Sequence, residues 1–159
     1  MMLASSYAGI GFGNAGVHLP HGMSYPVSGL NRGWIAPGYK SVDHPLVPHG
    51  ISVILNAPAV FRFTACADPV RHLRAAEILG ADVRRASPAD AGAILSGQLI
   101  QLMQDLGVPN GLRALGYHSS DIPALVEGTL PQLRVTKLSP RTAGPEELAR
   151  LFEDSMVLW

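Results

Sequence analysis

Paired helix-start and helix-stop signals divide the second half of the chain into helix-sized segments. Asp68-Pro69 and Ser87-Pro88 each join a residue that caps a helix N-terminus to a proline suited to the first helical turn. Gly80 and Gly107 follow where such helices would end. Similar signals open a short segment at residues 120–121 and a last one at residues 142–145. We therefore predict four helices after Cys66.

The apolar segment Ile51–Phe63 is rich in Ile, Val and Phe, which by propensity favours a strand. We expect a helix instead, because the alternation is poor, Asn56 and Pro58 would interrupt a strand ladder, and no second strand-like run exists to pair with it. Residues 3–17 are dominated by small side chains, so we expect a buried, tightly packed helix there. The sequence predicts an all-α helical bundle that forms a single domain over residues 1–159.

Charge and cysteine content exclude several classes of protein. The 12 basic and 12 acidic residues leave no net charge, which argues against a nucleic-acid partner. Cys66 is the only cysteine, so no internal disulfide or thiolate cluster can form, and we expect a reducing, cytoplasmic location. The most apolar stretch, 46–63, contains polar residues and prolines, so we expect no membrane contact. Only 15% of residues are charged, which favours an exposed interface and self-association.

Four of the six histidines lie between His18 and His49. Neutral imidazole is the commonest metal ligand, and the alternative is a scatter of surface or hydrogen-bonded core histidines. His21 and Tyr25 are four residues apart and would share a helical face if a new turn starts at Pro20. His49 precedes the apolar helix in a proline-glycine turn, where its side chain is well placed to face a cleft. The cluster is a candidate metal site.

Several runs of this sequence resemble the iron-containing (group III) alcohol dehydrogenases, and more narrowly their hydroxyacid-oxoacid transhydrogenase branch. The runs are 13–18 (GNAGVH), 21–26 (HGMSYP), 43–50 (DHPLVPHG), 76–82 (AEILGAD), 121–126 (DIPALV) and 134–138 (RVTKL). They are spread over essentially the whole chain. The resemblance implies the helical C-terminal domain of that family, with the active site in a cleft that faces an N-terminal nucleotide-binding domain absent from this chain.

The resemblance also implies cofactors. The family's iron is held by one Asp and three His, and by motif match His21 and His49 would be two of these ligands, with Fe(II), or alternatively Zn(II), as the metal. The other two ligands belong to a motif that lies before this chain begins, and NAD(P) would bind through the missing domain. The glycines at 9–13 do not form a dinucleotide fingerprint, because no strand precedes them and their spacing is wrong.

Tyr25 stands where many members of the family have a further His near the substrate, and we take it as the candidate catalytic residue. A phenol there can hydrogen-bond substrate or simply pack. His18, Asp43 and His44 are candidates for positions around the metal or substrate, and Asp43 is suited either to orient a histidine or to cap a turn.

The resemblance implies hydride transfer between a nicotinamide and a small-molecule hydroxy acid or alcohol. In the transhydrogenase branch, oxidation of 4-hydroxybutyrate to succinate semialdehyde is coupled to reduction of 2-oxoglutarate. Arg32 and Lys40 are candidate partners for substrate carboxylates, or else solvated loop charges. A mitochondrial matrix location is expected in a eukaryote.

Three alternatives stay open at this point. The first is another iron-containing alcohol dehydrogenase. The second is a catalytically inactive, stand-alone helical fragment or interaction module. The third is a metal hydrolase that uses the local histidines. Whether this segment is itself an enzyme stays open, since it lacks the nucleotide-binding half.

Overall fold

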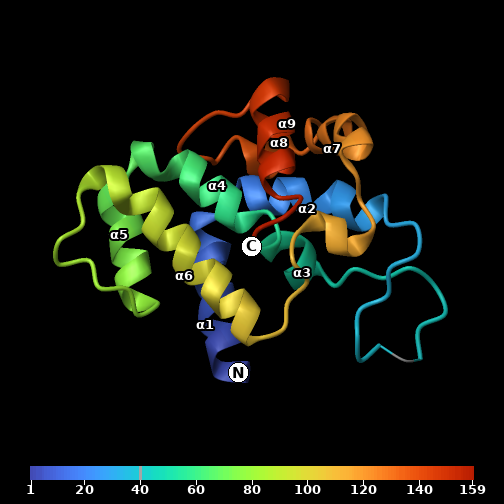
Figure 1. Ribbon diagram of the computed structural model, residues 1–159, viewed down its shortest axis with the longest axis horizontal. Helices are drawn as coiled ribbons and strands as arrows, with labels where there is room; N and C mark the ends of the chain where they lie inside the picture. Colours follow the sequence, from blue (N-terminus) through green and yellow to red (C-terminus); the bar gives the residue numbers. More distant parts are fainter. Residues whose placement is uncertain (40) are drawn as a thin grey trace.

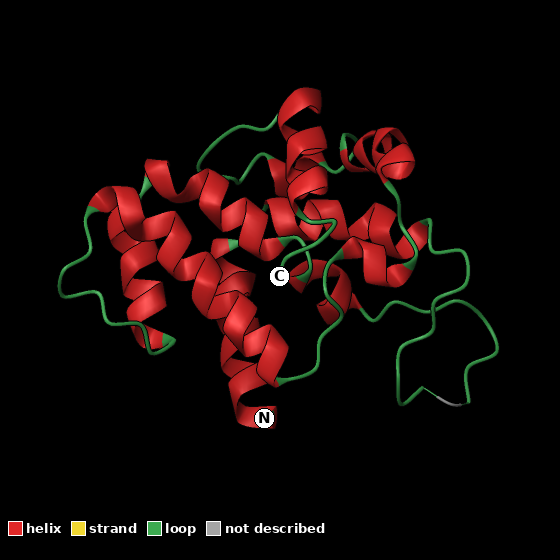
Figure 2. Cartoon of the chain, in the orientation of Figure 1, coloured by secondary structure: helices red, strands yellow, loops and turns green. Residues whose placement is uncertain are grey.

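The computed structural model describes residues 1–39 and 41–159, and within them the regular structure is helical (Figures 1 and 2). Extended pairing in this part of the chain is limited to one isolated parallel bridge, between Ile35 and Leu46. The predicted all-α class is confirmed. The α-helices are α1 (Met2–Ala15), α2 (Leu19–Gly29), α3 (His49–Ile54), α4 (Ala57–Thr64), α5 (Pro69–Ile78), α6 (Ala91–Asp105), α7 (Ile122–Thr129), α8 (Leu133–Thr136) and α9 (Pro145–Asp154).

The four helices predicted after Cys66 are present as α5, α6, α7 and α9. The Asp68 carboxylate caps α5 by accepting a hydrogen bond from Arg71 N at 3.1 Å. The carboxylate of Asp90 accepts a hydrogen bond from Ser87 N at 2.8 Å and closes a capping box ahead of α6. The 3-10 turns Pro88–Asp90 and Ser119–Asp121 lead directly into α6 and α7. A further 3-10 turn, Leu112–Leu115, and the short helix α8 were not predicted.

The apolar segment is helical, as predicted, but it is divided in two. Helices α3 and α4 are separated at Leu55–Asn56, where Pro58 occupies the first turn of α4. The side-chain amide of Asn56 donates a hydrogen bond to the Ser52 carbonyl oxygen at 2.8 Å. A side chain therefore pairs with this carbonyl oxygen near the break. A 3-10 turn, Ala65–Ala67, extends this helical stretch to Ala67.

The stretch His49–Ala67 is long and apolar enough, by length and composition, to cross a membrane, with a mean hydropathy of 1.4. Its polar residues and prolines therefore do not disqualify it, contrary to the argument from sequence. Half of it is buried inside the fold, and the core helix of a globular protein meets the same criteria. The expectation that this chain has no membrane contact stays a prediction.

Helix α2 lies at the centre of the bundle and packs against α3, α7 and α8 (Figure 1). Its apolar residues Leu19, Met23 and Val27 are at most 1% exposed and belong to one core with residues of α4, α7 and α9. Two glycines allow the closest approaches around α2. A methyl group on Gly22 would lie 2.5 Å from Thr136 Cγ2 of α8, and one on Gly128 of α7 would lie 2.7 Å from Pro26 Cβ. These contacts fix α7 and α8 against α2.

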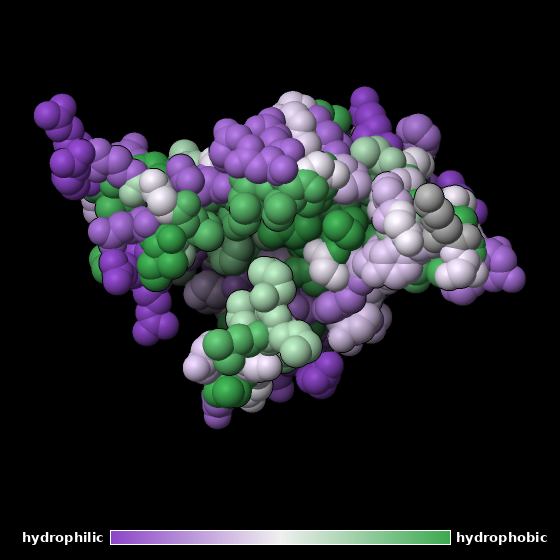
Figure 3. All heavy atoms as spheres, turned by 90° about the horizontal axis from the view of Figure 1, so that it is seen from below, coloured by the Kyte–Doolittle hydropathy of each residue, from purple (hydrophilic) through white to green (hydrophobic). Residues whose placement is uncertain are grey.

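Helix α1 is not the buried helix that its small residues suggested. None of its residues is buried, and a methyl group added at Gly9, Gly11 or Gly13 would find nothing within 4 Å. The reason for the error is that no other described element packs along this helix. Large apolar side chains on α1, Ile10 and Phe12 among them, are therefore exposed. Seen from the side on which the N-terminus lies, hydrophobic side chains gather across the middle of the molecule (Figure 3).

Candidate active site

A cavity of about 510 Å³ opens where α1, α2, α3 and α8 meet. Its size falls in the range of small-molecule sites, and its wall combines apolar residues with a few polar groups, as is usual for such sites. Three of the residues selected from sequence line it: His21, Tyr25 and His49. The rest of the wall is formed by Phe12, Gly13, Gly16, Val17, Arg134, Val135 and Leu138.

The two histidines come from the first turns of neighbouring helices. His21 follows Pro20 in the first turn of α2, and His49 is the first residue of α3. Each backbone carbonyl accepts a hydrogen bond from the serine three residues later, Ser24 at 2.7 Å and Ser52 at 2.9 Å. The two imidazole rings lie 5.2 Å apart between centroids, with their planes at 58°. The packing of α2 on α3 therefore brings together the two predicted metal ligands.

The electrostatics of the pair keep imidazole lone pairs available. Partial burial lowers the pKa of His21, and the nearby His49 lowers that pKa further. A neutral imidazole is the form that binds a metal. Fe(II) and Zn(II) both accept such nitrogen donors, so the donor chemistry fits a resident metal of this kind.

Two imidazoles are fewer than a catalytic metal site normally takes from protein, since three protein ligands are usual. Within residues 1–39 and 41–159, no cluster of three or more His, Cys, Asp or Glu side chains is arranged to hold a metal ion. These residues therefore provide two nitrogen donors toward a metal site.

Tyr25 lies one helical turn beyond His21, lines the cavity, and is 42% exposed in total. Arg134 Nη2 on α8 lies 3.5 Å from the Tyr25 hydroxyl, at the long end of hydrogen-bond distance. Analysis of the sequence missed Arg134 as a site residue. It sits in a four-residue helix, and nothing in the sequence pattern indicates that this helix packs beside α2.

His18 lies beside this cavity without lining it. As the N-cap residue of α2 it has its ring edge-to-face with Phe61, at 6.0 Å between centroids. Burial lowers the pKa of His18, and the charges of His21 and His72 add to that effect. Its Nδ1 atom is buried without a hydrogen-bond partner in the described part of the chain. A role for His18 around the metal or substrate stays a prediction.

Asp43 and His44 lie in the loop between α2 and α3 and do not line the cavity. Both are exposed, and His44 Nδ1 is 3.2 Å from Asp43 Oδ1. In the described part of the chain the Asp43 carboxylate contacts its sequence neighbour His44 and makes no hydrogen bond to His21 or His49.

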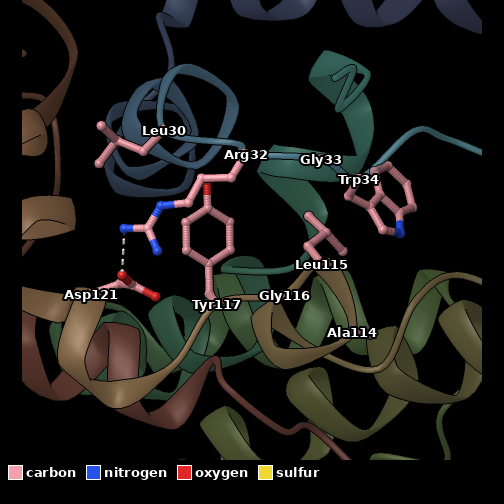
Figure 4. Close-up of a pocket in the computed structure, with 9 residues that line it drawn as sticks. All are labelled: Leu30, Arg32, Gly33, Trp34, Ala114, Leu115, Gly116, Tyr117 and Asp121. Atoms are coloured by element: carbon pink, nitrogen blue, oxygen red, sulfur yellow. Dashed lines mark hydrogen bonds and ion pairs between the residues drawn. The ribbon is translucent and has the colours of Figure 1, made fainter. Parts of the chain in front are cut away.

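Of the two cations that the sequence suggested as carboxylate partners, the structure describes Arg32, which does not line the cavity with the histidines. Arg32 forms an ion pair with Asp121 at 2.9 Å and borders a different cavity, of about 360 Å³, which Tyr117 and Trp34 also line (Figure 4). Lys40 lies outside the described residues. Arg134 is instead the cation at the cavity that holds the histidine pair.

An all-α fold with a paired-histidine cavity defines the class to which this chain belongs. Residues 39–156 match the family model described as Fe-containing alcohol dehydrogenase family, C-terminal. The chain belongs to this family of oxidoreductases. Its fold matches an alcohol dehydrogenase from Oenococcus oeni with a TM-score of 0.78 at 25% identity, over 93% of this chain and 35% of the other. A 1,3-propanediol oxidoreductase matches with a TM-score of 0.69, also at 25% identity, over 86% and 32%.

Within the family, curated relatives that share 57–64% identity with this chain carry one enzyme name. The chain is 64% identical to the mitochondrial hydroxyacid-oxoacid transhydrogenase of Xenopus laevis and 62% identical to that of Homo sapiens. It is 57% identical to a probable mitochondrial hydroxyacid-oxoacid transhydrogenase of Dictyostelium discoideum. All three matches cover the whole chain. The chain spans 34% of the frog and human proteins and 29% of the Dictyostelium protein.

Proposed function

We propose that this chain forms the metal-binding and substrate-facing part of a hydroxyacid-oxoacid transhydrogenase. In the reaction, 4-hydroxybutyrate gives up a hydride and a proton to become succinate semialdehyde, and 2-oxoglutarate takes up a hydride and a proton to become 2-hydroxyglutarate. NAD(P), when bound, would supply the hydride carrier for both half-reactions, and the proposal assigns its binding to residues outside this segment. The observation that carries the proposal is the pair of imidazoles, 5.2 Å apart at the wall of the cavity.

His21 and His49 would hold Fe(II), which supplies Lewis acidity toward the substrate oxygen when bound. The hydroxyls of Ser24 and Ser52 donate hydrogen bonds to the carbonyl oxygens of the two histidines and so hold the backbone that carries both rings. The Tyr25 hydroxyl would donate a hydrogen bond to the hydroxyl or carbonyl oxygen of the substrate, and its position at the cavity wall supports this role. Apolar side chains of Phe12, Val17 and Leu138 cover part of the wall and reduce contact of the reacting carbon with water.

Another iron-containing alcohol dehydrogenase is the second candidate function, favoured by the structural match to the Oenococcus enzyme. Identity to that enzyme is 25%, against 57–64% to the transhydrogenases of frog, man and Dictyostelium. The higher identity supports the transhydrogenase proposal. Since these relatives carry mitochondrial names, we place the protein in the mitochondrial matrix within the same proposal.

The exposed apolar surface of α1 supports the proposal that this chain associates, either with the nucleotide-binding region or with itself. Ile10 is 63% exposed and Phe12 is 55% exposed, although both are apolar. The neutral net charge adds no repulsion between copies.

The test replaces the matching segment of the frog relative with this chain and measures reduction of 2-oxoglutarate by 4-hydroxybutyrate in the presence of NAD. We expect a folded chimera with activity within about tenfold of the frog enzyme. We expect His21→Ala in the chimera to lower kcat/KM more than about a hundredfold, because a Lewis-acid metal contributes several kcal/mol to a barrier. A matched His44→Ala change should have no effect. A folded chimera that oxidises butanol but transfers no hydride to 2-oxoglutarate would support the second candidate instead.

A further inference from the structure

We propose that Arg134 binds the carboxylate of the substrate, with Tyr25 beside it, and thereby selects hydroxy acids over simple alcohols. The inference rests on the proposed function and deepens it, because it assigns a substrate-recognition residue to the same cavity. Among the described residues that line this cavity, those of 1–39 and 41–159, Arg134 is the one with a permanent charge. Apart from the two histidines and Tyr25, the remaining wall is apolar or glycine.

Most N–H donors of the Arg134 side chain have no partner in the described part of the chain. No carboxylate of the described chain forms an ion pair with it, whereas Arg32, Arg71, Arg74 and Arg84 each have one. Its hydrogen bond within this part of the chain is the 3.5 Å contact with the Tyr25 hydroxyl, which is long and uncharged. A guanidinium carries five N–H donors arranged to meet a carboxylate in bidentate fashion. Most of its donors can therefore turn to a ligand.

The backbone under Arg134 is held in place while its side chain is exposed. The next residue, Val135, is 4% exposed, and a methyl group added at Gly22 on α2 would lie 3.6 Å from its Cγ2 atom. Gly22 in turn directly follows His21, so the same close approach of α8 and α2 positions both the cation and the metal-binding imidazole. This arrangement places an anion-binding group and a metal-binding group at one cavity, as a substrate with a carboxylate at one end and a hydroxyl at the other requires.

The charge and the apolar wall of this cavity suit a monocarboxylate. Arg134 belongs to a four-residue helix, and its single positive charge matches the single negative charge of a carboxylate. The apolar wall suits the methylene chain of a hydroxy acid.

The test compares 4-hydroxybutyrate with 1,4-butanediol, which replaces the carboxylate by a neutral CH₂OH group. Dissociation constants are measured by NMR titration of the 159-residue chain and its variants. We expect 4-hydroxybutyrate to bind more tightly than the diol. Arg134→Gln should raise the dissociation constant of 4-hydroxybutyrate about tenfold and leave that of the diol unchanged, because hydrogen bonds to charged groups contribute more than neutral ones. Arg134→Lys should restore part of the difference. Lys137→Gln removes a charge three residues away, outside the cavity lining, and should change neither constant.

Two outcomes would overturn the inference: equal binding of the two ligands by the unchanged chain, or equal weakening of both by Arg134→Gln. A second readout is the ratio of kcat/KM for 4-hydroxybutyrate to that for 1,4-butanediol in the frog chimera, which should fall about tenfold with Arg134→Gln. The binding measurement needs no turnover, so it can succeed when the activity measurement fails. Selective binding of the carboxylate, together with a chimera that transfers no hydride, would refute the proposed function and keep this inference.

Discussion

The imidazole rings of His21 and His49 lie 5.2 Å apart, although the two residues belong to different helices joined by a long loop. Their proximity depends on the packing of α2 against α3, with Leu19, Met23 and Leu55 at most 1% exposed in the shared core. The hydrogen bonds from Ser24 and Ser52 support the first turn of each helix. The core of the bundle therefore determines the geometry of the candidate site.

Gly22 should be sensitive to substitution, because α8 lies against it. An added methyl group would meet the β-branched Thr136 side chain at 2.5 Å, and overpacking of this kind costs about 1–3 kcal/mol. We predict that Gly22→Ala lowers the free energy of unfolding by about that amount, measured by urea denaturation. Gly29, in the last turn of α2, has open space where a methyl would go, so Gly29→Ala should be neutral or slightly stabilising. Equal effects of the two changes would contradict a close α2–α8 contact.

Tyr117 should make the protein sensitive to alkali. Its buried hydroxyl donates a 2.6 Å hydrogen bond to the Val27 carbonyl oxygen, and burial, with the nearby Asp121 charge, raises its pKa to about 12. The folded state then keeps a proton that the unfolded state releases from about pH 10 upward. We predict that stability is complete below pH 10 and falls by about 1–2 kcal/mol as the pH rises toward 12.

The matched variants for this prediction are Tyr117→Phe and Tyr7→Phe. Tyr117→Phe should lower the free energy of unfolding at pH 7 by about 1–2 kcal/mol, because the hydrogen bond is lost. It should also remove the part of the stability loss at high pH that comes from ionisation of Tyr117. Tyr7 is 65% exposed on α1, so the second should match the unchanged protein at both pH values. The measurement is urea denaturation at pH 7 and pH 11. An alkaline loss that persists in full in Tyr117→Phe would refute the assignment.

Self-association of the 159-residue chain should depend on α1. We predict dimers or larger species in sedimentation velocity, shifted toward monomer by Ile10→Glu, because a charge placed in an apolar contact is costly to desolvate. Val70 on α5 is 73% exposed, and Val70→Glu serves as the control that should leave the distribution unchanged. A monomer at all concentrations tested would count against association through this surface.

Much of the fold followed from local signals that operate within a few residues. The Asp68-Pro69 and Ser87-Pro88 signals marked α5 and α6, because the caps that form there join residues close in sequence. The burial of α1 was predicted wrongly because small residues permit close packing but do not supply a partner helix. Helix α8 was missed because four residues show no periodicity.

Motifs that resemble the family singled out three residues of the site, but the run 134–138, which also resembles the family, gave no sign that Arg134 lies there. His21, Tyr25 and His49 stand in motifs that resemble a family, and the structure gathers them at one cavity. Arg134 reaches the same cavity through the approach of α8 to Gly22, a contact between residues far apart in sequence. Arg32 was a reasonable candidate by chain position, but its ion pair with Asp121 forms at a different cavity.

The most direct test of the metal-site assignment is an anaerobic titration of the 159-residue chain with Fe(II), and in parallel with Zn(II). We predict one-to-one binding that weakens at least about tenfold in both His21→Ala and His49→Ala, because each change removes one of two nitrogen donors. His44→Ala, in the exposed loop, should bind as the unchanged chain does. Binding that is indifferent to both cavity histidines, or that is lost with His44→Ala, would contradict the metal site assigned to His21 and His49.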